Sequence, residues 1–231
     1  MLFPVYQPIV DVRDGSIFGF EANVRGKDAN GKIVRYEQLR ESNLYPALDY
    51  VARDIALINF RLKHYKLFVN VAPEELDKPL FSEDLELNNV VLEITEESSE
   101  STNLDLDRLE KKLNKLRDNG LEIALDDFGS QRQNYDRITR YSPTFLKLDK
   151  SIVKDNMLGN FVNLIHQHQV IVEGIETKEQ LNSCINLGFH YVQGYYLSNS
   201  LDSDTLKTDL INHDLQINIQ ENLALKKLVT P

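Results

Sequence analysis

The sequence contains a single cysteine, no tryptophan and no long apolar run. Cys184 has no partner for a disulfide within the chain, which favours a reducing, cytoplasmic location. Its neighbours Leu181 and Ile185 predict that the thiol lies on a buried helix face. No apolar stretch approaches the roughly 18 residues of a membrane helix, and the N-terminal residues lack the basic region of an export signal. We therefore expect a soluble protein without membrane insertion.

Basic residues are also scarce, with 26 Lys and Arg against 36 Asp and Glu. The formal net charge of −10 argues against a broad surface for a nucleic acid polymer, because such a surface needs clustered cations. An anionic ligand would therefore need cations placed locally. With 231 residues, 42% of them hydrophobic, the chain can bury a sizeable core as one domain, residues 1–231.

The run LEIALDDFGS at residues 121 to 130 is the most informative segment that is present. It leads from apolar residues directly into two acids, Asp126 and Asp127, followed by Phe128 and Gly129. Taken alone, Asp-Asp-x-Gly is more often a turn that ends a strand, in which Asp bonds its own backbone and Gly supplies a positive φ. Two carboxylates at the end of a buried strand are also typical of a metal site.

The same arrangement is repeated along the chain, and this repetition favours the functional interpretation. Several other short apolar runs carry or end in a polar residue capable of chemistry: Glu21 and Arg25, Asn70, Glu93, Lys147, Glu173 and Glu176, and Gln193. Each of these residues alone is more easily explained as a turn cap, a surface strand end or a solvated side chain. Together they predict a shared site.

Segments with helical period separate these strand-like runs. One helix is predicted from the stripe Leu106, Leu109, Leu113 and Leu116, with Gly120 as its C-terminal cap. A second is predicted from the stripe Leu48, Val51, Ile55, Ile58 and Leu62, and a third opens with a capping box at Thr177 and Gln180. This alternation predicts an α/β fold with a parallel sheet, closed as a (β/α)8 TIM-like barrel over about residues 3–200. The less regular residues, about 201–231, are expected to form a helical tail.

A parallel barrel opens all the C-terminal strand ends onto one face, so the polar residues listed above are expected to converge there. Acids crowded in this way raise one another's pKa values unless a cation compensates them. Carboxylate and amide oxygens, without Cys or His, favour Mg²⁺ or Mn²⁺ over zinc. There are enough acids for two ions, the arrangement used for in-line displacement at phosphorus.

At this point the chain resembles the EAL family of cyclic di-GMP phosphodiesterases, from YQPIVD near residue 6 to QGYYLS near residue 198. The motifs that carry the resemblance are EANVR at 21–25, NVA from 70, EITE at 93–96, DDFG at 126–129, KLD at 147–149, EGIE at 173–176 and QGY from 193. The resemblance implies an EAL-type barrel that converts cyclic di-GMP to linear pGpG.

The resemblance also implies individual roles. The implied metal ligands are Glu21, Asn70, Glu93, Asp126 and Asp127. Lys147 and Glu173 are implied to position or activate the attacking water, with Glu96 and Glu176 supporting the site and its loop. Arg25, Gln7 and Gln193 are the implied substrate-binding residues, with Arg25 on a phosphate and Gln7 on a guanine. A homodimer is a further assembly that the family allows.

Three departures from the family pattern are visible. The signature leucine is Asn23, and the loop after Asp-Asp-Phe-Gly reads SQRQN at 130–134, where the family has Thr-Gly-x-Ser-Ser. The stretch from Lys150 to Val170 is several residues shorter than usual, which predicts a truncated helix. The sequence therefore leaves open an active phosphodiesterase, a degenerate EAL module that binds cyclic di-GMP or a protein without hydrolysis, and, less specifically, another Mg²⁺-dependent barrel enzyme such as a lyase.

Overall fold

The computed structural model describes residues 2–28, 30–35, 45–76, 78–82, 85, 87–95, 106–129 and 135–207. Within this part of the chain, eight strands close into a barrel in the order β1-β9-β8-β7-β6-β5-β4-β2, with β2 pairing back to β1. The strands are β1 (Leu2–Asp11), β2 (Ser16–Lys27), β4 (Lys66–Val71), β5 (Val90–Ile94), β6 (Glu122–Phe128), β7 (Phe145–Leu148), β8 (Gln169–Val172) and β9 (Tyr191–Val192). The predicted TIM-like α/β barrel is confirmed.

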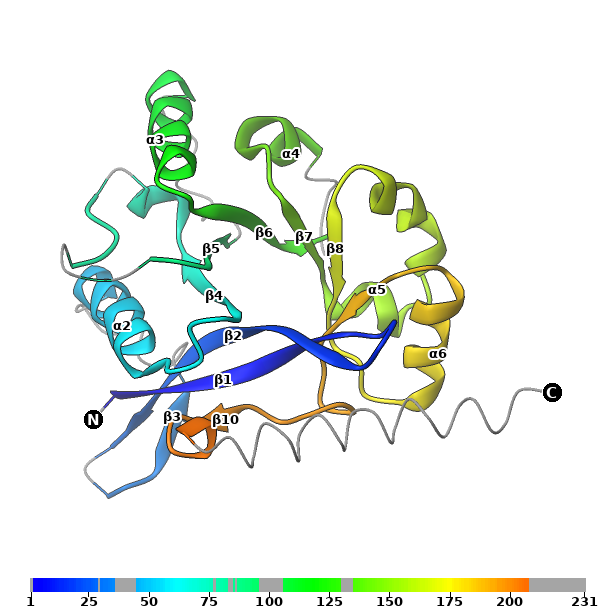
Figure 1. Cartoon of the computed structure of the whole chain (residues 1–231), viewed down its shortest axis with the longest axis horizontal. Helices are drawn as coiled ribbons and strands as arrows, with labels where there is room; N and C mark the ends of the chain where they lie inside the picture. Colours follow the sequence, from blue (N-terminus) through cyan, green and yellow to red (C-terminus); the bar gives the residue numbers. More distant parts are fainter. Residues whose placement is uncertain are drawn as a thin grey trace.

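One strand departs from the parallel sheet that the sequence predicts. β1 pairs antiparallel with both β2 and β9, whereas the other pairs of the barrel, from β2–β4 round to β8–β9, are parallel (Figure 1). The cause lies in the short turn between β1 and β2, where Gly15 N donates to Asp11 O and Gly15 has a φ of 78°. A parallel pair needs a crossover of a dozen or more residues, so a turn of this length allows only an antiparallel pair.

Helices cover the outside of the barrel (Figure 1). They are α2 (Tyr45–Asn59), α3 (Leu106–Asp118), α4 (Tyr135–Tyr141), α5 (Lys150–Lys154) and α6 (Lys178–Asn186), with 3-10 turns η1 (Pro73–Glu75), η2 (Leu158–His166) and η3 (Thr205–Lys207). The predicted capping box of α6 is present, with Thr177 and Gln180 each bonding the other's backbone. Between β7 and β8 the α-helix has only five residues, as the shortened segment predicts.

The predicted apolar face of α2 is wrong. Val51 and Ile58 are 42% and 56% exposed, and Leu62 lies beyond the end of the helix. The buried residues of the helix are instead Ala52, Arg53, Ala56 and Leu57, and the Ala56 carbonyl accepts a hydrogen bond of 2.7 Å from the Tyr6 hydroxyl. Two alanines and an arginine are among them, so a pattern of large apolar residues does not reveal this face.

Two short strands extend the sheet beyond the barrel. β3 (Ile33–Arg35) pairs with β2, and β10 (Leu201–Asp202) pairs with β1. The segment expected to begin a helical tail therefore starts with a strand, and residues 208–231 lie outside the described part. Among the described residues, no helix combines the length and the apolar character needed to cross a membrane.

Candidate active site

The side chains inside the barrel form an apolar layer and, directly above it, a polar layer that contains the site. Six buried apolar residues fill the lower interior: Ile9, Phe68, Val91, Ala124, Phe145 and Ile171, with Tyr191 packed against them. Because side chains two residues apart on a strand share a face, the next inward position on each strand lies one layer higher. Those positions are Asn70, Glu93, Asp126, Lys147, Glu173 and Gln193, and on the antiparallel β1 the equivalent residue is Gln7. The barrel thus changes from apolar to polar within one step along each strand.

Lys147 stands at the centre of this polar layer. Its ammonium forms ion pairs with carboxylates from four other parts of the barrel: Glu21, Glu93, Asp126 and Glu173. The Nζ atom lies 2.6 Å from Glu173 Oε1 and 3.4 Å from Asp126 Oδ1. The Lys147 side chain is 1% exposed and that of Glu93 is 0% exposed, so these charges interact with little screening by water.

Burial and charge crowding shift the titration of the site. Burial raises the pKa of Glu93 well above its usual range and raises the pKa of Glu173 to about 8, although Lys147 opposes both shifts. Burial acts to lower the pKa of Lys147, but Asp126 and Glu173 outweigh it and raise that pKa well above the ordinary value. Lys147 therefore carries a positive charge at neutral pH, and Glu173 exchanges its proton near neutrality.

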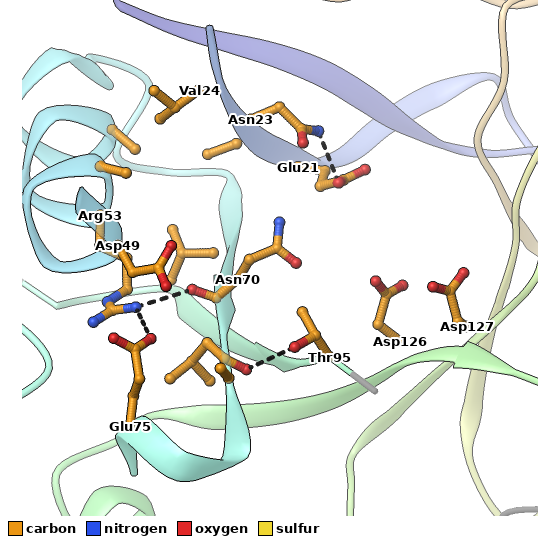
Figure 2. A pocket seen from close by; sticks show the side chains of 16 residues that line it. Glu21, Asn23, Val24, Asp49, Arg53, Asn70, Glu75, Thr95, Asp126 and Asp127 are labelled. Carbon is orange, nitrogen blue, oxygen red and sulfur yellow. Dashed lines mark hydrogen bonds and ion pairs between the residues drawn. The ribbon is translucent and has the colours of Figure 1, made fainter. Parts of the chain in front are cut away.

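A bulge in β6 places two adjacent acids on the same side. The register between β6 and β7 shifts between Leu125 and Phe128, and Asp127 has a φ of 51°. In a regular strand, neighbouring side chains point to opposite faces, but the bulge allows Asp126 and Asp127 to lie side by side (Figure 2). Burial, Asp126 and a hydrogen bond with Asp149 raise the pKa of Asp127 to about 7.

Two amide side chains hold the carboxylate of Glu21, which lies on β2. Asn23 Nδ2 donates to Glu21 Oε1 at 2.8 Å, and Gln193 Nε2 donates to Glu21 Oε2 at 2.6 Å. Gln193 Nε2 also donates to Gln7 Oε1 at 3.3 Å, which joins β1 to the same network. Both oxygens of Glu21 are thus fixed by groups from β2 and from the end of β9.

Two cavities open on either side of this layer. The α2 lobe, about 360 Å³, lies between β2, β4 and α2, and the β8 lobe, about 290 Å³, lies toward the ends of β7 and β8. Four residues line both: Glu21, Asn23, Asp126 and Asp127. The acid pair therefore stands where the two lobes meet, a suitable position for a ligand that extends in both directions.

The α2 lobe is supported by a buried ion pair. Arg53 Nη1 lies 2.8 Å from Glu75 Oε2, and both side chains are 5% exposed. Arg53 also donates to the backbone carbonyl of Asn70 at 3.5 Å, while the Asn70 side chain points away from Arg53 toward Glu21 (Figure 2). The ion pair lines the α2 lobe and supports the end of β4 there.

The residues present fit divalent cations. Oxygens of Glu93, Asp126 and Glu173 lie within 4.8 Å of one another, and the buried Glu93 Oε2 has no hydrogen-bond partner among the described residues. When ionised, these three acids with Glu21 and Asp127 carry five negative charges, and Lys147 offsets only one. Carboxylate and amide oxygens are donors that Mg²⁺ and Mn²⁺ accept.

The predicted site residues fall into three groups. Eight lie in the polar layer or its bulge: Gln7, Asn70, Glu93, Asp126, Asp127, Lys147, Glu173 and Gln193. Glu21 joins them from β2, and Arg25 and the exposed Glu176 line the β8 lobe. Glu96 lies outside the described residues, as does the divergent loop 130–134. The individual chemical roles stay predictions.

The sequence reasoning missed several supporting residues. Arg137 is 3% exposed and donates to the carbonyls of Ile94 and Thr95, both at 2.9 Å, and to that of Asp126 at 3.3 Å. It therefore ties the ends of β5 and β6 together from α4. No motif marks Arg137. The sequence analysis named Asn23 only as a departure from the family signature and Asp149 only as part of the KLD motif, although each is two residues from a predicted site residue on the same strand or at its end.

Comparison with known proteins agrees with this geometry. The profile of the EAL domain family matches residues 1–200. The chain is 30% identical over 223 residues to the probable cyclic di-GMP phosphodiesterase PdeI of Escherichia coli K12, an alignment covering 84% of this chain and 28% of PdeI. It is 27% identical over 231 residues to the cyclic di-GMP phosphodiesterase PA2567 of Pseudomonas aeruginosa, covering 88% of this chain and 39% of that protein. The chain thus spans well under half the length of these two relatives.

A solved structure gives the same result for the fold. The EAL-domain protein YkuI of Bacillus subtilis, solved with cyclic di-GMP and calcium, superposes with a TM-score of 0.72 at 25% identity, covering 98% of this chain and 62% of that chain. Because the family profile extends over residues 1–200 of the 231, the chain belongs to the EAL domain family.

Proposed function

We propose that this chain is a metal-dependent phosphodiesterase that hydrolyses cyclic di-GMP to linear pGpG. The observation that carries the proposal is the convergence of Glu21, Glu93, Asp126 and Glu173 around one buried lysine, at the junction of two lobes. A cyclic dinucleotide has a phosphodiester between two bases, which suits a cleft with acids at its middle and space on both sides. Relatives named as cyclic di-GMP phosphodiesterases support the same substrate.

Within this proposal, five residues hold the cations: Glu21, Asn70, Glu93, Asp126 and Asp127. Divalent cations at such a site stabilise negative charge on phosphorus oxygens and make water a better nucleophile at neutral pH. YkuI, solved with calcium and cyclic di-GMP, supports a divalent cation here, and we propose Mg²⁺ or Mn²⁺ as the working ion.

Within the proposal, two residues of the chain act on the proton of the attacking water and on the negative charge that develops during the reaction. Glu173, whose Oε1 lies 2.6 Å from Lys147 Nζ in the polar layer, is the residue that we propose accepts the proton of the attacking water. Lys147 offers a fixed positive charge beside the developing negative charge. The water oxygen bonds to phosphorus, one P–O bond of the ring breaks, and the departing ribose oxygen takes up a proton.

The β8 lobe supplies the substrate contacts. Arg25, Gln7 and Gln193 line it, and a guanidinium pairs well with a phosphate oxygen. We propose that Arg25 contacts the ligand's phosphate and that Gln7 contacts a guanine edge. Glu176 lies at the same lobe as a supporting residue, and Glu96 completes the predicted set.

We further propose one domain over residues 1–231, a cytoplasmic location for its reduced thiol, and a dimer whose formation light scattering can measure.

The test is a hydrolysis assay on the purified chain. Cyclic di-GMP incubated with Mn²⁺ or Mg²⁺ is expected to yield pGpG on reversed-phase chromatography, and Glu21→Gln is expected to abolish the product while circular dichroism stays unchanged. Glu122→Gln is the matched control, because Glu122 lies on β6 but pairs with Lys66 away from the site. Activity lost equally in both variants would contradict a specific role of Glu21.

A non-hydrolysing cyclic di-GMP receptor is the second candidate. It is favoured by the sequence SQRQN at 130–134, which departs from the family's loop directly after the two acids. Calorimetry with cyclic di-GMP and Ca²⁺ separates the two functions. Binding without any linear product at high protein and Mn²⁺ concentration would support the receptor and exclude the phosphodiesterase.

A further inference from the structure

The carboxylate of Glu21 is held on one side by a residue of its own strand. Asn23 Nδ2 donates to Glu21 Oε1 at 2.8 Å, while Gln193 Nε2 occupies Oε2 at 2.6 Å (Figure 2 shows the first contact). Glu21 and Asn23 are two residues apart on β2 and therefore share a face of the sheet. Ala22, which lies between them, and Val24, which follows Asn23, point to the other face of the sheet and are buried.

This contact is a property of the present chain. The family signature has leucine at the position of Asn23, and a leucine side chain has no hydrogen-bond donor. The substitution is also not hidden in the core, because Asn23 is half-buried and lines both the α2 lobe and the β8 lobe. The amide therefore stands at the junction of the two cavities, bonded to a carboxylate that faces the same space.

We infer that Asn23 is a positioning residue that holds Glu21 in a metal-binding conformation and thereby raises the affinity of the site for divalent cations. Each carboxylate oxygen has two lone pairs, so one hydrogen bond from Asn23 and one from Gln193 leave an electron pair free on each oxygen for a cation. A glutamate side chain that hydrogen bonds already hold in place loses less conformational freedom on binding a cation than a free glutamate side chain does. This inference rests on the proposed function, since it assumes that Glu21 is a ligand.

A purely structural role would look different. If Asn23 only fills space once occupied by leucine, then Asn23→Leu would restore the family's packing and leave cation affinity unchanged or improved. If Asn23 orients Glu21, the same change releases Oε1 and weakens cation binding, as removal of a group that orients a metal ligand usually does by roughly 10- to 100-fold. The two interpretations therefore predict opposite results for one substitution.

The experiment is calorimetric titration of the purified full chain with Mn²⁺ alone, before any substrate is added. We expect Asn23→Leu to weaken Mn²⁺ binding by about 10-fold or more, and Asn23→Gln, which keeps an amide donor, to bind more tightly than Asn23→Leu. The matched control is Asn59→Leu, which removes a half-buried amide donating at 2.8 Å to Ile55 O on α2, away from both lobes. Thermal unfolding of each variant in EDTA shows whether the substitution has reduced the stability of the fold.

The outcomes separate this inference from the proposed function. Equal Mn²⁺ affinity of Asn23→Leu and Asn59→Leu would overturn the positioning role, whether or not the wild-type chain hydrolyses cyclic di-GMP. Absence of Mn²⁺ binding by the wild-type chain would overturn both. If Asn23→Leu lowers kcat without changing Mn²⁺ affinity, the phosphodiesterase stands and the role assigned to Asn23 does not.

Discussion

Lys147 Nζ lies 2.6 Å from Glu173 Oε1, across neighbouring strands β7 and β8 at the centre of the barrel. The Lys147 side chain is 1% exposed, and three further carboxylates share its ammonium. Among the described side chains, Lys147 is the cation that forms ion pairs with these four acids, so it is the main charge that keeps them together in the metal-free protein.

Lys147→Met is expected to destabilise the metal-free protein strongly. Removing one partner of a buried ion pair leaves uncompensated charge and typically costs about 3–5 kcal/mol. The loss should be smaller in acid, where the carboxylates are protonated, and Mn²⁺ should raise the melting temperature of the variant more than that of the wild type. Thermal unfolding with EDTA or Mn²⁺ at two pH values measures this. Identical melting curves for both proteins would show that Lys147 does not balance the acids.

The stability of the metal-free protein should fall as the pH rises. Glu173 has an ordinary pKa of 4.5 and a pKa of about 8 in the folded chain, so the folded chain keeps a proton that the unfolded chain releases. The stability that this proton contributes is fully present below pH 4.5 and is lost as the pH rises through about 8. Asp127, raised from 3.8 to about 7, acts in the same direction. We expect the melting temperature in EDTA to decrease between about pH 5 and pH 8.5. Glu173→Gln should flatten this decrease, and an unchanged slope would contradict the assignment.

Asp127 combines charge repulsion with a left-handed backbone, and two substitutions separate these effects. Asp127→Asn removes the charge and tolerates the φ of 51°, so without metal it should be more stable than the wild type near pH 8. Asp127→Ala removes the same charge but disfavours that φ, and should be less stable than Asp127→Asn by about 1 kcal/mol. Urea unfolding gives both values. Both variants should bind Mn²⁺ less tightly, and undiminished binding would remove Asp127 from the ligand set.

Gly194, directly after Gln193, is required by close backbone contact. A Cβ at Gly194 would lie 2.1 Å from the Ile175 carbonyl oxygen, and the contacting atoms belong to the backbone and cannot rotate away. Gly194→Ala should therefore displace Gln193 from Glu21, lower the melting temperature and weaken Mn²⁺ binding. Gly159→Ala is the matched control, since a Cβ there meets nothing within 4 Å. If both variants melt and bind alike, the close contact with Ile175 has no functional consequence.

The strands and their polar ends could be predicted from the sequence because both follow from short-range pattern. Apolar runs define β4 through β8, and the residue two positions beyond the inward apolar side chain faces the same interior. This is why Asn70, Glu93, Lys147 and Glu173 could be named as candidates before the structure was known. Their convergence in space depends on barrel closure, which the alternation of strands and helices indicates.

The remaining features depend on partners that are distant in sequence. The antiparallel direction of β1 is set by a tight turn and by pairing with β9, and neither is marked by apolar spacing. Arg53 lies buried on α2 because Glu75 pairs with it, so a search for apolar stripes assigned the wrong face. The contact of Asn23 with Glu21 was visible only as a departure from a family signature, and its geometry required the side-chain positions.

The antiparallel β1 also determines when the site can exist during synthesis. Val10 pairs with Val192, and Gln7 contacts Gln193, so the two walls of the cleft are supplied by segments that leave the ribosome far apart in time. Until β9 has been made, β1 can pair only with β2, and β8 presents an open edge. Nascent chains that stop before residue 193 therefore lack the amide that fixes Glu21, and the polar layer is complete only once the ring of strands is closed.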